Sequence, residues 1–139
     1  MKSITYAQLK ANQQKEVDNF PFMFAFGREQ FDEMLKKNNV TVSDICSIGC
    51  GGYIRKTDFK AMHDMFDRHT AELAEARKQN KFLKEAILNE MSNHEYCVTY
   101  DREEVLNACG ITEDDFQKNE DVHKAWNAAK KNYMLAVEA

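Results

Sequence analysis

The sequence predicts a mostly helical α+β fold, in which a small sheet of about three strands packs against helices. Residues 57–93 carry apolar side chains at alternating intervals of three and four, which is the period of a buried helical stripe. Residues 20–26 and 96–100 are instead rich in aromatic or β-branched side chains, and residues 47–54 have the pattern of a strand interrupted by glycines. These three stretches supply the predicted strands.

The composition predicts a single domain covering residues 1–139. The chain has one proline and five glycines, too few to mark a linker between domains. A content of 43% hydrophobic and 30% charged residues is typical of a globular chain that can close a core, and it argues against disorder.

The first helices are marked by their ends. Thr5 and Gln8 have the spacing of a capping box, which predicts a helix to about residue 18. A second helix is expected over residues 28–37, ending at Asn38 and Asn39, with a helical turn at residues 41–45. The side chains expected on the inward faces of these two helices are Leu9, Val17, Phe31, Met34 and Leu35.

Between these helices, residues 20–26 alternate as an extended strand. Four phenylalanines fall on one side of it, with Met23 and Ala25 on the other. Because both sides are apolar, we expect a buried strand with at least two of the four rings in the core. Pro21 is expected at its start, where a missing donor is tolerated.

The glycine-rich segment before the long helical stretch is a candidate anion site. Glycines allow backbone amides to approach an anion, and a helix N-terminus with basic side chains favours negative charge. The expected ligand is a small anion such as a nucleotide signal, and the alternative is a structural turn or bulge. The P-loop pattern is not met, because Arg55 precedes the lysine. The residues of this candidate site are Gly49, Gly51, Gly52, Arg55, Lys56 and Thr57.

The helical stretch over residues 57–93 is either one helix or two helices with a bend near Asn80. One long helix would expose its apolar stripe and favour a homodimer, whereas two helices can bury the stripe within one chain. His69 and Asn80 are polar positions on the stripe and could fix the register of an interface. The candidate interface residues are Phe66, His69, Leu73 and Asn80.

The C-terminal third follows with a strand at residues 96–100 and three helices. Asp101 is expected to cap a helix that stops at Gly110, and Thr112 with Asp115 indicates another capped start. A last helix is expected over residues 121–137. It should bury Val122, Trp126, Ala129, Tyr133 and Val137.

Two further groupings carry ligand or catalytic residue types. Cys46, Cys50, His94 and Cys97 could supply three thiolates and an imidazole to zinc, although buried reduced cysteines also serve as small apolar residues. His94 with Glu95 and Cys97 could support an enzyme, the least favoured of the function classes. No cofactor is expected, and the balance favours a non-enzymatic protein.

Charge and hydropathy narrow the partners. A net charge of −4 argues against direct nucleic-acid binding and leaves a protein partner open. The longest apolar run, residues 20–26, is too short to cross a membrane, and the N-terminus lacks a signal-peptide core. We therefore expect a cytoplasmic protein with reduced cysteines.

Three motifs together resemble a known family. They are Phe24-Ala25-Phe26 followed by Glu29-Gln30-Phe31, then Ser47-Ile48-Gly49 with residues 51–56, then residues 94–97 with Thr99-Tyr100-Asp101. The chain resembles small uncharacterised proteins encoded by phages and mobile elements of gut Firmicutes. That family commonly has glycine at the position of Cys50, which counts against zinc, and it supplies no catalytic residues.

The resemblance implies a role in the bacterial host cytoplasm. Small acidic proteins of such elements often bind and inhibit a host protein. The leading hypothesis is therefore a non-enzymatic phage or mobile-element protein that binds a host macromolecule, for example an anti-CRISPR or other counter-defence inhibitor. The alternative is a protein that sequesters an anionic nucleotide signal at residues 49–57.

Overall fold

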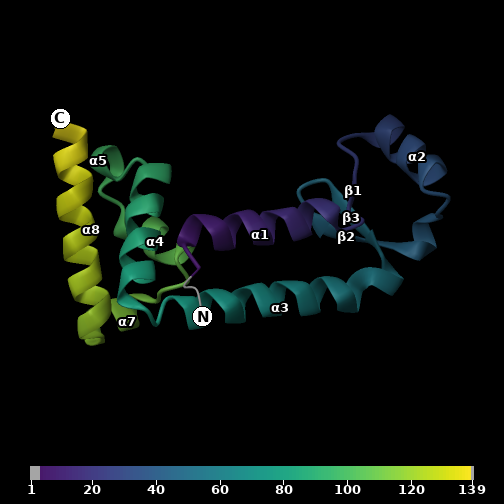
Figure 1. Cartoon of the computed structure of the whole chain (residues 1–139). Coiled ribbons are helices and arrows are strands. Elements are labelled where there is room, and N and C mark those ends of the chain that lie inside the picture. The colour runs from purple at the N-terminus through teal and green to yellow at the C-terminus, as the bar shows by residue number, and fades with distance from the viewer. Residues whose placement is uncertain (1–3, 139) are drawn as a thin grey trace. The chain divides into compact units, whose positions relative to one another are not determined.

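The computed structural model describes residues 4–138 and confirms the α+β class. These described residues are 73% helical and include one small antiparallel sheet. The elements, shown in Figure 1, are α1 (Tyr6–Asn19), β1 (Met23–Phe24), α2 (Arg28–Lys37), η1 (Val42–Asp44), β2 (Ile45–Gly49), β3 (Gly52–Arg55), η2 (Lys56–Asp58), α3 (Phe59–Ala76), α4 (Asn80–Asn93), α5 (Tyr96–Thr99), α6 (Arg102–Ala108), α7 (Glu113–Lys118) and α8 (Glu120–Glu138).

The chain divides into two compact units. The helical unit comprises Met1–Gln13 with His69–Ala139, and the sheet unit comprises Gln14–Arg68. The boundary falls within α1 and within α3. Each unit has its own hydrophobic core. The single domain over residues 1–139 stays a prediction.

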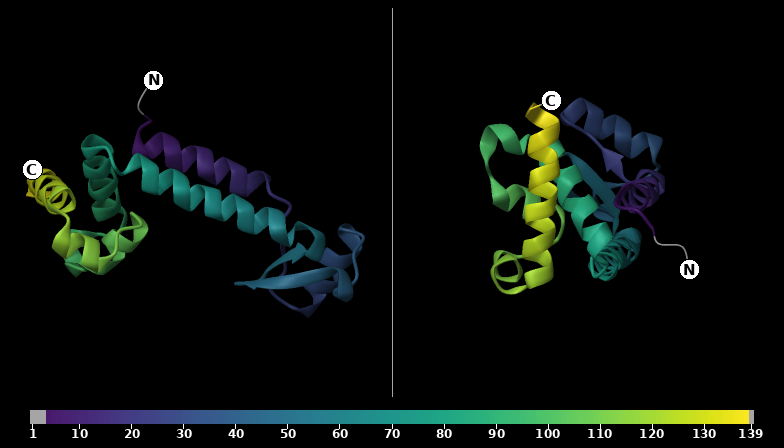
Figure 2. Two further views of the ribbon diagram at one scale, coloured as in Figure 1. Left: turned by 90° about the horizontal axis from the view of Figure 1, so that it is seen from below. Right: turned by 60° about the vertical axis from the view of Figure 1, so that its left-hand side comes forward.

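The core of the helical unit lies between α4 and α8, which run side by side (Figures 1 and 2). Both helices repeat apolar residues at the helical period, so one stripe of each is buried. Trp126 of α8 meets Tyr96 and Phe116 edge to face, with ring centroids 5.5 and 5.6 Å apart. The buried residues that the two helices contribute are Phe82, Leu83, Ala86, Ile87, Met91, Val122, Ala125, Trp126, Ala129 and Tyr133. Val137, expected in this set, is exposed.

Residues 96–100 form a helix and its cap, so the strand predicted there is wrong. Glu95 and Tyr100, on either side of α5, have left-handed backbones with φ of 48° and 52°. In this single turn the Tyr96 and Tyr100 rings meet edge to face, with their centroids 5.6 Å apart, and Val98 is exposed to solvent. The burial of Tyr96 against Trp126 overrides the strand preference of its neighbours.

The sheet unit contains three antiparallel strands in the order β1–β3–β2, with α2 beside them (Figures 1 and 2). The segment predicted as one interrupted strand is a hairpin, because β2 and β3 pair across a turn at Cys50 and Gly51. The predicted bulge is present between Ser47 and Gly49. The core beneath α2 is made of Met23, Ala25, Met34 and Ile45.

The prediction of a buried phenylalanine strand at residues 20–26 is wrong in its orientation. Only Met23 and Phe24 pair with β3. α2 covers the side that carries Met23 and Ala25, so these smaller residues form the core. Phe20 and Phe22 are half-buried, and Phe24 and Phe26 are exposed. None of the four rings is a core residue.

The long helical stretch is interrupted near the predicted position. α3 ends at Ala76 and α4 begins at Asn80, after a turn at residues 77–79. Three predicted caps are also confirmed. Thr5 and Gln8 exchange hydrogen bonds in a capping box, Asp101 caps α6, and Thr112 caps α7.

Candidate functional site

The exposed phenylalanines of the described chain all lie in the sheet unit. They are Phe24, Phe26, Phe59 and Phe66, accompanied there by the exposed Val42 and Ile48. Phe24 and Phe26 have 59% and 74% of their surface exposed. Where such exposed large apolar side chains lie together, they are typical of a surface that binds a partner.

Phe24 and Phe66 form one continuous surface with the half-buried rings of Phe20 and Phe22. The Phe22 ring lies 4.9 Å from Phe20, 6.4 Å from Phe24 and 6.5 Å from Phe66, measured between centroids. Phe66 on α3 is stacked with Phe22 at an interplanar angle of 26°. We call the surface made by Phe20, Phe22, Phe24 and Phe66 the phenylalanine face.

The sheet extends this face beyond the rings. Gly52 of β3 is paired directly with Phe24, so the two residues share one side of the sheet. A Cβ atom on Gly52 would lie only 2.9 Å from Cγ1 of Ile48. The Ile48 side chain therefore covers Gly52 and continues the apolar surface from Phe24.

A groove runs along the free edge of the sheet at β1. Its volume is about 520 Å³, and one wall is formed by Phe22, Met23 and Phe24. The other wall is α2, which contributes Gln30, Glu33, Met34, Lys37 and Asn38 at its end. Gln30 also accepts a hydrogen bond from the backbone N–H of Phe26 at 2.9 Å, fixing α2 to the segment after β1.

The predicted anion site is distributed along β3. Gly49 and Gly51 lie in the hairpin turn with φ of 91° and 78°, conformations that favour glycine. Arg55 is at the opposite end of β3, about 10 Å away at 3.3 Å per residue. Its Nη2 donates to the carbonyl oxygen of Asn38 at 3.0 Å, which joins β3 to the end of α2. Lys56 and Thr57 follow in η2. The turn and the basic residues do not form one compact cradle.

The predicted zinc ligands are shared between the units. Cys46 and Cys50 belong to the β2–β3 hairpin of the sheet unit, whereas His94 and Cys97 belong to the helical unit. All four cysteines of the chain are free thiols, as expected. The zinc site stays a prediction.

A polar cluster that sequence reasoning missed surrounds Glu90 of α4. Its side chain is 2% exposed, and Oε1 accepts hydrogen bonds from Lys10 Nζ at 2.9 Å and Asn93 Nδ2 at 2.8 Å. His94 lies between two carboxylates, with Nε2 3.6 Å from Glu90 and Nδ1 3.7 Å from Glu104. The sequence did contain one signal of this cluster, because position 90 places a charged residue on the apolar stripe through residues 83, 87 and 91.

The electrostatics of this cluster follow from burial. Burial alone would raise the pKa of Glu90, but the hydrogen bonds from Lys10 and Asn93 outweigh it and hold the pKa below its usual value. Burial, reinforced by the Glu90 carboxylate, raises the pKa of the Cys109 thiol to about 12 and raises the pKa of Tyr6. The carboxylate stays ionised and the thiol stays protonated, which suits a structural ion pair rather than a nucleophile.

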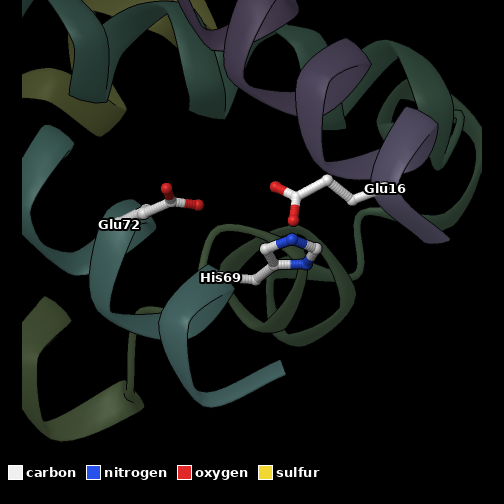
Figure 3. Close-up of side chains that lie close together, drawn as sticks. All are labelled: Glu16, His69 and Glu72. Carbon is white, nitrogen blue, oxygen red and sulfur yellow. The ribbon is translucent and has the colours of Figure 1, made fainter. Parts of the chain in front are cut away.

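The predicted interface residues have different surroundings. Phe66 is part of the phenylalanine face, Leu73 packs against the core of the helical unit, and Asn80 is exposed at the start of α4. His69 is buried. Figure 3 shows His69 and Glu72, one turn apart on α3; their ligand atoms lie within 4.8 Å of each other. Gln13 donates to the carbonyl oxygen of His69 at 3.1 Å and to Glu72 at 3.3 Å.

Comparison with protein families identifies a match over most of the chain. The model of a family of unknown function, DUF7659, matches residues 5–132. The chain belongs to this family. No curated protein and no solved structure matches it. Among residues 4–138, no helix has both the length and the apolar character needed to span a membrane.

Proposed function

We propose that this DUF7659 protein is a non-enzymatic binding protein whose phenylalanine face contacts another protein. The observation that supports this most is the placement of Phe24, a residue that is 59% exposed although it lies in a paired strand. Aromatic side chains are enriched among the residues that contribute most to protein binding. Their exposure on a free surface costs solubility, and burial against a partner offsets that cost.

The polar groups of the helical unit give less support to catalysis. Lys10 and Asn93 both donate to Glu90, so the buried carboxylate already has partners. Glu90 and Glu104 lie within 3.7 Å of the His94 ring nitrogens. The Cys97 amide donates to the hydroxyl of Tyr133 at 3.0 Å, a contact that anchors α5 to α8. These contacts are consistent with structural roles. Sequestration of an anionic nucleotide has weaker support than protein binding, because Arg55 is engaged with Asn38.

The proposal can be extended to the origin of the partner and the cellular location. The resemblance to proteins of phages and mobile elements supports a host protein as the partner and the bacterial host cytoplasm as the location. A net charge of −4 over the whole chain leaves a basic protein partner open. Inhibition of a CRISPR nuclease or another defence protein is the most specific version of this role.

The test compares matched surface variants in a capture experiment. Phe24→Ser alters the phenylalanine face, and Leu135→Ser alters an exposed apolar side chain on α8 with nearly the same exposure, 59% against 58%. Each chain is immobilised and incubated with a Firmicute lysate, and bound proteins are quantified by mass spectrometry. A protein held by the wild-type and Leu135→Ser chains should fall at least about tenfold on Phe24→Ser, the loss expected for a central aromatic contact.

Circular dichroism of the three chains controls for folding. Equal recovery of every bound protein on wild-type and Phe24→Ser chains would contradict the proposal, because the binding would then use another surface. Loss on Leu135→Ser alone would move the binding surface to α8.

A further inference from the structure

We infer that the β1 edge binds an extended segment of the partner, which pairs with β1 as a fourth strand in the groove beside α2. This inference rests on the proposed function and specifies how the partner is bound. Three features support it. The backbone N–H and C=O of Phe24 point to the free edge, the groove has one wall on each side of that edge, and the opposite edge of the sheet, at β2, is interrupted by a bulge.

The hydrogen-bonding direction of β1 follows from its register. The N–H of Ala25 donates to the carbonyl oxygen of Gly51 at 2.9 Å. In an antiparallel pair, residues alternate between those bonded to the neighbouring strand and those whose N–H and C=O point away from it. Met23, paired with Tyr53, has the same orientation as Ala25, so Phe24 directs its backbone N–H and C=O to the free edge.

The neighbouring backbone groups limit the pairing to Phe24. The N–H of Phe22 is bonded to Phe20 O at 2.7 Å, and the N–H of Phe26 is bonded to Gln30. Phe24 therefore supplies a donor and an acceptor on one residue, which is what a residue of an added strand needs. A helix would not match this donor and acceptor, because its own backbone N–H and C=O groups are bonded to each other within the helix.

The walls of the groove suit the alternating side chains of such a segment. Phe24 is on the side of the sheet away from α2, so the residue paired with it projects onto the phenylalanine face. The flanking residues project the other way, towards Glu33, Met34 and Lys37 of α2. We therefore expect an apolar or aromatic residue opposite Phe24, flanked by residues that complement Glu33 and Lys37. A volume of about 520 Å³ gives room for a few residues of extended chain.

The opposite edge of the sheet is protected. β2 has a bulge between Ser47 and Gly49, and Gly49 has a φ of 91°. Bulges bend and twist a strand and so discourage pairing with another chain. β1 has no register shift in its pairing with β3. The added strand is accordingly assigned to β1.

The experiment selects peptides and then tests their backbone. A displayed library of random peptides, each about twelve residues long, is selected on the full wild-type chain and counter-selected on the Phe24→Ser chain. The enriched sequences should alternate apolar and polar residues. The strongest peptide is then synthesised with single N-methyl groups at successive amides, and its affinity is measured by calorimetry.

The expected pattern has a period of two. N-methylation of the amide that donates to Phe24 should weaken binding at least about tenfold, and methylation of its immediate neighbours should weaken it less than about twofold. In ¹⁵N spectra, the Phe24 amide should exchange with solvent more slowly when the peptide is bound.

Four outcomes would overturn the inference. The first three are an absence of peptides that distinguish wild type from Phe24→Ser, affinities that do not depend on N-methylation, and unchanged exchange at Phe24. The fourth is a peptide affinity that decreases as the concentration of the chain rises. In that case a second copy of this chain competes with the peptide for the β1 edge, and the inference of a different partner fails. If Phe24→Ser still loses a protein in the lysate experiment, the proposed function stands and only the strand pairing fails.

Discussion

Lys10 of α1 and Glu90 of α4 form an ion pair, with Nζ 2.9 Å from Oε1, although they are 80 positions apart in the sequence. The Glu90 side chain is 2% exposed, whereas Lys10 is half exposed. The lysine therefore keeps contact with water, and the desolvation penalty falls mainly on the carboxylate. The hydrogen bond from Asn93 helps to offset that penalty. The pair joins the first turns of α1 to the core of the helical unit.

Replacing Glu90 with Gln should reduce stability at neutral pH and have no effect in acid. The pKa of Glu90 is lowered in the folded chain from an ordinary value of 4.5. A lowered folded pKa stabilises the protein above the unfolded pKa, and this contribution is lost as pH falls through the folded pKa. We expect a deficit of about 1–3 kcal/mol at pH 7 for Glu90→Gln, shrinking steadily below pH 4.5. Urea unfolding followed by Trp126 fluorescence across this pH range measures it.

Glu113→Gln is the matched control. Glu113 also has a lowered pKa, caused first by the hydrogen bond from Arg102, but this carboxylate is exposed on α7. Solvent screening makes such surface pairs weak, so the deficit should be smaller than that of Glu90→Gln. A deficit for Glu90→Gln that persists unchanged at pH 3 would show that shape, not charge, sets the effect.

The local signals in the sequence predicted the helices well. α2 covers the predicted residues 28–37, because Asn38 and Asn39 end it and Asn39 adopts a left-handed backbone with φ of 53°. Capping at Thr5, Asp101 and Thr112 depends on contacts within three residues, which a sequence shows directly. The break before Asn80 was one of two interpretations that the pattern left open.

The sequence could not predict which side of residues 20–26 is buried. Both sides are apolar, and the position of α2 decides between them by covering Met23 and Ala25. The strand predicted at residues 96–100 was wrong for a similar reason. Tyr96 packs against Trp126, which is 30 positions away in the sequence. The Glu90 cluster depends on Lys10, 80 positions away. Contacts over such separations are set by the fold, so a local pattern can mark one residue, as the charge on the apolar stripe marks Glu90, but it cannot identify the distant partner.

Replacing Asn80 with Leu tests the helix break. Asn80 is exposed at the start of α4 in the described structure. A leucine there should gain no burial, so stability should change by less than about 0.5 kcal/mol and sedimentation should match wild type. A stabilised dimer in the sedimentation experiment would instead support one continuous helix with an interface through residue 80.

Replacing Gly51 and Gly27 with Ser should have different effects on stability. Gly51 has a φ of 78°, and a Cβ there would lie 2.5 Å from Cε1 of Phe26. The Phe26 ring can move aside, but the backbone strain stays, so Gly51→Ser should destabilise the sheet unit by about 1–2 kcal/mol. Gly27 is the extended N-cap of α2 with nothing within 4 Å of its Cβ position, and Ser caps helices well, so Gly27→Ser should be neutral or slightly stabilising. Hydrogen exchange at β3 amides reports both effects, and equal losses would contradict the assignment of strain to Gly51.

Phe24→Ala and Met23→Ala, at neighbouring positions of β1, should differ strongly in stability. Phe24 is 59% exposed, so its truncation should cost less than about 1 kcal/mol, well below the 3–5 kcal/mol typical of a core phenylalanine. Met23 is buried against Met34 and Ile45, and its truncation should cost about 2–4 kcal/mol.

Because Trp126 belongs to the helical unit, the measurement should follow the sheet unit itself, through hydrogen exchange of β3 amides in increasing urea. A cost for Phe24→Ala equal to that for Met23→Ala would mean that the ring is part of the core. In that case the phenylalanine face would not be available to a partner.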